Sequence, residues 1–112
     1  MIISKSKKIR AIRKSIIHWQ ENVDKIIKCK SYVQKKTCSY SSIDCALCNL
    51  MENYGGECTQ CPLEYNGYGC FRWKSPYSNF CDAMEKETAL ARAKNMVKVL
   101  REILEKELKN NA

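Results

Sequence analysis

The chain has 112 residues, enough for one domain and too few for two independent hydrophobic cores. A hydrophobic content of 45% argues against wholesale disorder, and four glycines with two prolines are too few for an all-β chain with many tight turns. Eight cysteines and a formal net charge of +8 are the unusual features, and the single histidine, His18, excludes zinc motifs that need two histidines from this chain.

The first segment, residues 1–36, is predicted to be a basic amphipathic helix that frays near residues 30–36. Its apolar residues recur every three or four positions, as on one face of a helix: Ile9, Ile12, Ile16, Trp19, Val23 and Ile26. Ile17 and Ile27 are expected to widen this stripe. The segment carries eleven Lys and Arg against Glu21 and Asp24, giving +9.

The middle segment, residues 37–81, loses this periodicity and collects the turn-forming residues together with seven of the eight cysteines. A short helix is expected over residues 45–54, with Ser42 or Asp44 as its cap. Because the segment has too few large apolar residues to fold by burial alone, we expect it to be cross-linked.

The last segment, residues 82–112, is predicted to be a second amphipathic helix. Its apolar stripe consists of Leu90, Ala93, Val97, Leu100 and Leu104. Neither helix can bury such a stripe alone, so we expect a single, mainly α domain in which the two long helices pack antiparallel, joined by an irregular cysteine-rich metal-binding segment. The alternative is that part of one stripe forms a homodimer.

Two C-x-x-C pairs, nine residues apart, predict a four-thiolate metal site. They are Cys45 with Cys48 and Cys58 with Cys61, and Cys70 is a possible replacement ligand. Such pairs hold zinc in closed structural sites. An iron–sulfur cluster and disulfides are the alternatives.

The basic residues of the first helix predict a surface for an anionic partner. The candidates are Lys7, Lys8, Arg10, Arg13 and Lys14, and the alternative is that they form only a solvated face. A second candidate ligand site consists of Arg72, Lys74, Tyr77, Trp19 and His18, where aromatic rings would stack on a nucleotide. The alternative for its aromatic residues is a role in the core.

No stretch has the features of a signal peptide or the roughly 18 apolar residues of a membrane span. We therefore expect an intracellular protein without a membrane partner, in which clustered reduced cysteines bind metal more often than they form disulfides.

The ordered series of short motifs resembles a group of small cysteine-rich phage and prophage proteins of unassigned activity. The motifs are His18-Trp19, Cys45-Ala-Leu-Cys48, Cys58-x-x-Cys61-Pro-Leu, Gly69-Cys70, Ser75-Pro76-Tyr77 and a closing amphipathic helix. The resemblance implies a phage protein acting in the cytoplasm of a bacterial host, where small proteins of this kind are often host-takeover or anti-defence factors.

These observations predict a zinc-stabilised, non-enzymatic protein that binds an anionic partner. The alternatives are a nucleotide-signal sponge with an enclosed pocket, a nucleic-acid-binding regulator, an inhibitor of a host protein and, with least support, a hydrolase that uses His18 and a spare thiol.

Overall fold

The computed structural model describes residues 3–29, 45–52, 61–70, 75–81, 83 and 85–109. Within these ranges the chain forms helices and no strand. The helices are α1 (Lys5–Ile27), α2 (Ala46–Glu52), α3 (Pro62–Tyr65), α4 (Pro76–Cys81) and α5 (Lys86–Lys109).

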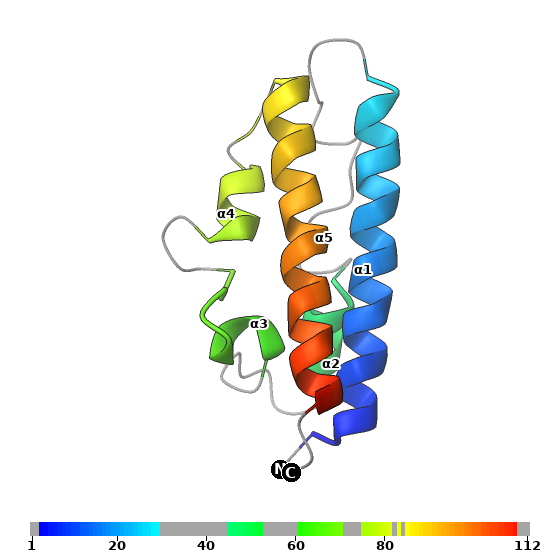
Figure 1. Ribbon diagram of the computed structural model, residues 1–112, viewed down its shortest axis with the longest axis vertical. Helices are drawn as coiled ribbons and strands as arrows, with labels where there is room; N and C mark the ends of the chain where they lie inside the picture. The colour runs from blue at the N-terminus through cyan, green and yellow to red at the C-terminus, as the bar shows by residue number, and fades with distance from the viewer. Residues whose placement is uncertain are drawn as a thin grey trace.

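The two long helices, α1 and α5, lie side by side and run in opposite directions (Figure 1). At one end of the pair, the Lys86 ammonium donates a hydrogen bond to the Ile27 carbonyl over 2.9 Å. The short helix α2 packs on α1, whereas α3 and α4 pack on α5. The predicted mainly helical fold, with two long helices packed antiparallel, is confirmed.

Helix α1 begins where the Ser4 hydroxyl accepts a hydrogen bond from the Lys7 backbone N–H, a typical N-cap. The predicted stripe is buried at Ile12, Trp19, Val23 and Ile26. The described helix ends at Ile27, and residues 30–36 lie outside the described residues.

The expected widening of the stripe by Ile17 and Ile27 is wrong, because these side chains are 59% and 51% exposed. At about 100° per residue, Ile17 lies roughly 200° around the helix from Trp19 and therefore faces away from the core.

Helix α5 buries the predicted stripe at Ala93, Val97 and Leu100, and Leu90 and Leu104 are partly buried against the same core. Ala89 and Ala93 are fully buried, and their small side chains allow the helices to approach closely. The charges of α5 suit its dipole, with Glu87 in the first turn and Lys106 and Lys109 in the last turn.

The cysteine-rich segment, expected to be largely irregular, contains three short helices among its described residues. Helix α2 begins one residue after the start of the predicted 45–54 range, and residues 53 and 54 and both proposed caps lie outside the described residues. The short helices add buried apolar side chains to the shared core: Leu47, Met51, Leu63 and Phe80. The segment is therefore attached to the long helices by burial as well as by any cross-link.

Two isoleucines of α1 test this orientation. Replacing Ile12, which is 0% exposed, by Ala removes buried methyl groups and should lower the free energy of unfolding by about 2–4 kcal/mol. The same replacement at Ile17 should lower it by less than about 0.5 kcal/mol. Urea unfolding of the two variants measures both values, and equal losses would contradict the described burial of α1.

Candidate functional site

Four of the five candidate metal ligands lie in the described residues. Cys45 directly precedes α2 and Cys48 lies within it, Cys61 is the N-cap residue of α3, and Cys70 follows the turn after α3. Cys61 is buried and the other three are partly buried, and none of these four cysteines is in a disulfide. Cys58 lies outside the described residues. We call these four described residues the thiol cluster.

The thiols of the cluster influence one another. A hydrogen bond from the Cys48 thiol is the largest effect on Cys45 and lowers its pKa to about 6, although burial acts in the opposite direction. The same hydrogen bond is the main cause of the raised pKa of Cys48, followed by burial and by the charges of Cys45, Cys70 and Cys61. Cys45 before α2, Cys48 within α2, the N-cap of α3 and the turn after α3 therefore share one electrostatic environment.

Tyr77 of α4 borders the thiol cluster. Its pKa is raised mainly by burial, then by a hydrogen bond with Cys81 and by the charges of Cys81, Cys70 and Cys45. The Ser75 hydroxyl connects the cluster to α4, because it donates to the Cys70 carbonyl over 3.1 Å and accepts from the Ser78 N–H over 3.1 Å.

Ser15 of α1 lies beside Cys45 of the thiol cluster. Its side chain is 3% exposed, and its hydroxyl has no hydrogen-bond partner among the described residues. The hydroxyl contributes to the lowered pKa of Cys45 and is therefore placed to donate to a thiolate at that position. A buried hydroxyl without a partner is costly, and an ionised Cys45 would supply an acceptor.

Within the described residues, no group of three or more His, Cys, Asp or Glu side chains lies close enough to hold a metal ion. The expected set of Cys45, Cys48, Cys58 and Cys61 includes a residue outside this range. Among the described thiols, Cys45 is the one whose pKa the Ser15 hydroxyl lowers, and a buried hydroxyl donor of this kind suits a thiolate ligand.

The predicted anion-binding residues separate into two groups. Lys7, Arg10, Arg13 and Lys14 are exposed on α1. Lys8 is partly buried, and its ammonium lies 5.2 Å from the centre of the Tyr65 ring. We call the four exposed residues the basic face.

The second candidate ligand site is described only in part. Trp19 is 4% exposed and packs edge-to-face against Phe80, with ring centres 4.7 Å apart. His18 is partly buried, and its ring lies edge-to-face with that of Trp19, with ring centres 6.0 Å apart. Trp19 lies in the core, which agrees with the alternative interpretation of the aromatic residues. Arg72 and Lys74 lie outside the described residues.

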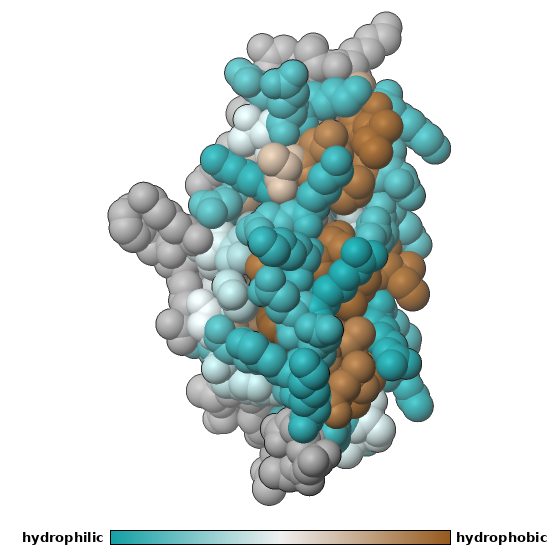
Figure 2. All heavy atoms as spheres, viewed as in Figure 1, coloured by the Kyte–Doolittle hydropathy of each residue, from teal (hydrophilic) through white to brown (hydrophobic). Residues whose placement is uncertain are grey.

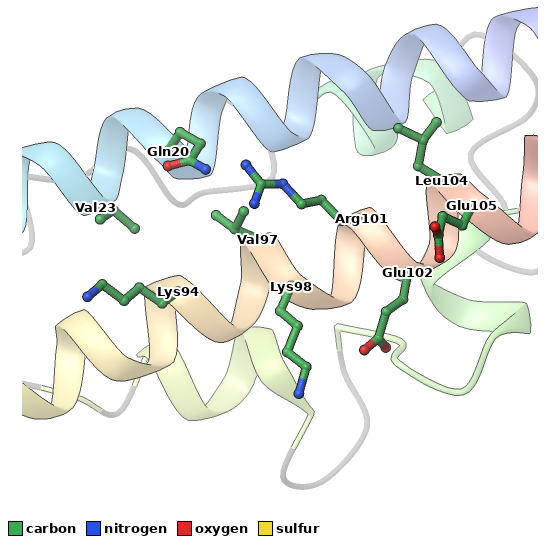
Figure 3. Close-up of a pocket in the computed structure, with 9 residues that line it drawn as sticks. All are labelled: Gln20, Val23, Lys94, Val97, Lys98, Arg101, Glu102, Leu104 and Glu105. Atoms are coloured by element: carbon green, nitrogen blue, oxygen red, sulfur yellow. The ribbon is translucent and has the colours of Figure 1, made fainter.

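A surface groove of about 680 Å³ lies elsewhere, between α1 and α5 (Figure 3). Its lining combines apolar side chains with charges of both signs: Gln20, Val23, Lys94, Val97, Lys98, Arg101, Glu102, Leu104 and Glu105. The sequence pattern did not identify this groove, because its charged residues were assigned to the solvent face of the second helix.

Four buried polar residues were also missed: Ser15, Asn22, Ser75 and Glu107. Ser15 and Asn22 fall at helical spacing with Trp19 and Ile26, so the periodicity placed them on the buried face even though their polarity did not. The Glu107 carboxylate accepts a hydrogen bond from the Tyr65 hydroxyl, which ties α3 to α5. A glutamate among lysines gives no signal of burial in the sequence.

Comparison with protein-family models, with curated proteins and with solved structures found no match to this chain. None of the helices formed by the described residues has the length and apolar character needed to cross a membrane.

The contact between Tyr65 and Glu107 can be tested by removing one hydroxyl. Tyr65→Phe leaves the buried Glu107 carboxylate without this donor and should lower the free energy of unfolding by about 1–3 kcal/mol. In a Glu107→Ala background the same change should cost little, which urea unfolding of all four proteins measures. An equal cost in both backgrounds would show that the hydroxyl acts through another group.

Proposed function

We propose that this protein is a metal-stabilised, non-enzymatic binding protein whose basic face docks on a phosphate-rich polymer. The observation that carries the proposal is the exposure of Lys7, Arg10, Arg13 and Lys14 on one stretch of α1. Residues 1–20 contain no Asp or Glu, so the sequence nearby supplies no compensating negative charge. Such a surface attracts polyanions and releases their counterions on binding.

The position of these cations in the helix strengthens the proposal. The first turn of α1 contains lysines and no acidic residue, whereas helix dipoles favour acidic residues at this end. The positive potential of the helix N-terminus therefore adds to that of the side chains. This arrangement disfavours the isolated helix and favours an anion near its surface.

An exposed isoleucine, Ile17, lies at the C-terminal end of the basic face. Ile17 follows Arg13 and Lys14 by one helical turn and Arg10 by two turns, so all four point the same way. Beyond Ile17 the exposed face turns acidic at Glu21 and Asp24. The anion-binding surface is therefore limited to the first half of α1.

The chemistry of the face favours recognition of a phosphate backbone over recognition of base edges. Its residues are long cations, which contact phosphates at any sequence, and the face has no Asn or Gln between Lys7 and Ile17. The core position of Trp19 also argues against a stacking platform for a nucleotide, because an indole that packs on Phe80 offers no free ring face at the surface.

The proposed metal site has a supporting role. Zinc held by Cys45, Cys48, Cys61 and either Cys58 or Cys70 would join α2 and α3, and Ser15 would donate a hydrogen bond to the Cys45 thiolate from α1. When bound, the metal supplies folding free energy and no reaction chemistry. The resemblance to small phage proteins supports a host-takeover or anti-defence setting in a bacterial cytoplasm.

Two matched double variants test the basic face against duplex DNA. Arg10→Gln with Lys14→Gln should weaken binding and reduce the slope of log affinity against log salt by about 2, because two fewer phosphates are neutralised. Lys25→Gln with Lys28→Gln removes the same charge from exposed positions of α1 and its C-cap and should change binding little. Fluorescence anisotropy over a salt series measures the affinity of both variants. Equal effects would contradict the proposal, because they would show that binding depends on net charge and not on the basic face.

Metal analysis tests the site. Purified protein should contain about one zinc per chain, and Cys45→Ser or Cys61→Ser should lower the zinc content and the melting temperature together. Cys29→Ser is the control, because the Cys29 thiol donates to the Lys25 carbonyl within α1 and is not an expected ligand. Cys58→Ser and Cys70→Ser identify the fourth ligand. Wild-type protein that keeps its melting temperature after chelation would refute the site, and a brown protein containing iron would reassign it.

A further inference from the structure

One side of the α1–α5 pair is not covered by the short helices. In Figure 1, α3 and α4 lie beside α5, and α2 lies behind the pair. On the face toward the viewer, apolar surface runs along the seam between α1 and α5 (Figure 2). The groove lined by Val23, Val97 and Leu104 lies on this seam. Within the described residues, the short helices therefore cover one side of the α1–α5 contact and leave the other side uncovered.

The charges of the groove are segregated along α5. Lys94, Lys98 and Arg101 come first, and Glu102 and Glu105 follow. Eleven positions separate Lys94 from Glu105, which returns an α-helix to within about 20° of the same direction, so Lys94 and Glu105 lie on one line about 16 Å apart along the helix. Lys98 and Glu102 both point off α5 on the side away from α1 (Figure 3). One end of this face is positive and the other is negative.

This arrangement is symmetric about the middle of the helix. Lys94 and Glu105 are equally distant from position 100 to within one residue, and so are Lys98 and Glu102. A second α5 laid antiparallel, with a two-fold axis near Leu100, would place Lys94 against the partner subunit's Glu105. The same axis would place Lys98 against the partner subunit's Glu102, and symmetry forms each contact twice.

The apolar residues of the same face fit the same axis. Val97 and Leu104 are also equally distant from position 100 to within one residue, so each would meet the other across the axis. Leu90, which is partly buried, would lie near the partner subunit's Leu108, whose side chain is 48% exposed in the single chain. Charge and apolar matching therefore select one register.

We propose that the uncovered α1–α5 face binds a second copy of this chain, with the two α5 helices antiparallel about an axis near Leu100. A polyanion or an acidic peptide would attract the lysines but would be repelled by Glu102 and Glu105. A second copy places an opposite charge against both the basic and the acidic residues. The basic face is a separate surface, since none of its residues lines the groove. The dimer goes beyond the proposed function and does not depend on it.

A charge swap in the full-length, metal-replete protein tests the dimer. Lys94→Glu and Glu105→Lys, made separately, should each turn two attractive contacts into two repulsive ones and raise the dimer dissociation constant about tenfold or more. The double variant Lys94→Glu with Glu105→Lys restores opposite charges and should return the dissociation constant to near the wild-type value. Sedimentation equilibrium over a wide concentration range measures all four proteins.

Lys106→Glu is the control, because this exposed residue of α5 does not line the groove and changes the net charge by the same amount as Lys94→Glu. Circular dichroism shows that each variant keeps its helices. A wild-type protein that stays monomeric at all concentrations overturns the proposal. So does a dimer that neither single swap weakens, or a double swap that fails to restore association. Because DNA binding is measured separately, failure of the dimer leaves the basic-face result unchanged.

Discussion

The contact between α1 and α5 is the interaction on which the rest of the structure depends. The fully buried Ile12 and Ile26 come from one helix, and Ala89, Ala93 and Leu100 come from the other. Apolar surface of this kind stabilises a chain in proportion to the area removed from water, and small alanines let the helices approach closely enough to exclude water between them. The short helices have no comparable core of their own. They bury Leu47, Leu63 and Phe80 against the surface that the pair provides.

The thiol cluster lies where these short helices meet the long pair. Cys45 precedes α2, Cys48 lies within it and Cys61 is the N-cap of α3, and the Ser15 hydroxyl of α1 lies near Cys45. A bound metal here would connect short elements with only a few buried side chains each, for which cross-linking contributes the most. The contact of Tyr65 with Glu107 and Lys8 serves a similar purpose for α3, since it joins this four-residue helix to both long helices.

The exposed surfaces of the long helices have different characters. The outer side of α1 is basic in its first half, with the exposed Ile17 at the end of this stretch, and becomes mixed in charge from Glu21 onward. The groove between α1 and α5 is apolar at its base and carries charges of both signs along α5. A surface of uniform positive charge suits a polyanion. A surface with a positive end and a negative end suits a partner whose charged ends lie in the opposite order. The proposed DNA contact and the proposed dimer therefore use separate parts of the molecule.

The sequence by itself determined the two long helices and their apolar faces, because a stripe at three- and four-residue spacing can be buried only on one side of a helix. It also identified the basic stretch and the paired cysteines, which depend on local spacing. Tertiary structure decided the rest. Only packing shows that Ile17 and Ile27 face solvent, that Lys8 lies over Tyr65, that Ser15 is buried beside Cys45, and that Glu107 is satisfied by a hydroxyl 42 positions away in the chain. The groove depends on which side of the α1–α5 pair the short helices cover. The helical period of the sequence cannot predict that side, because it shows which face of each helix is apolar but not which other element packs on it.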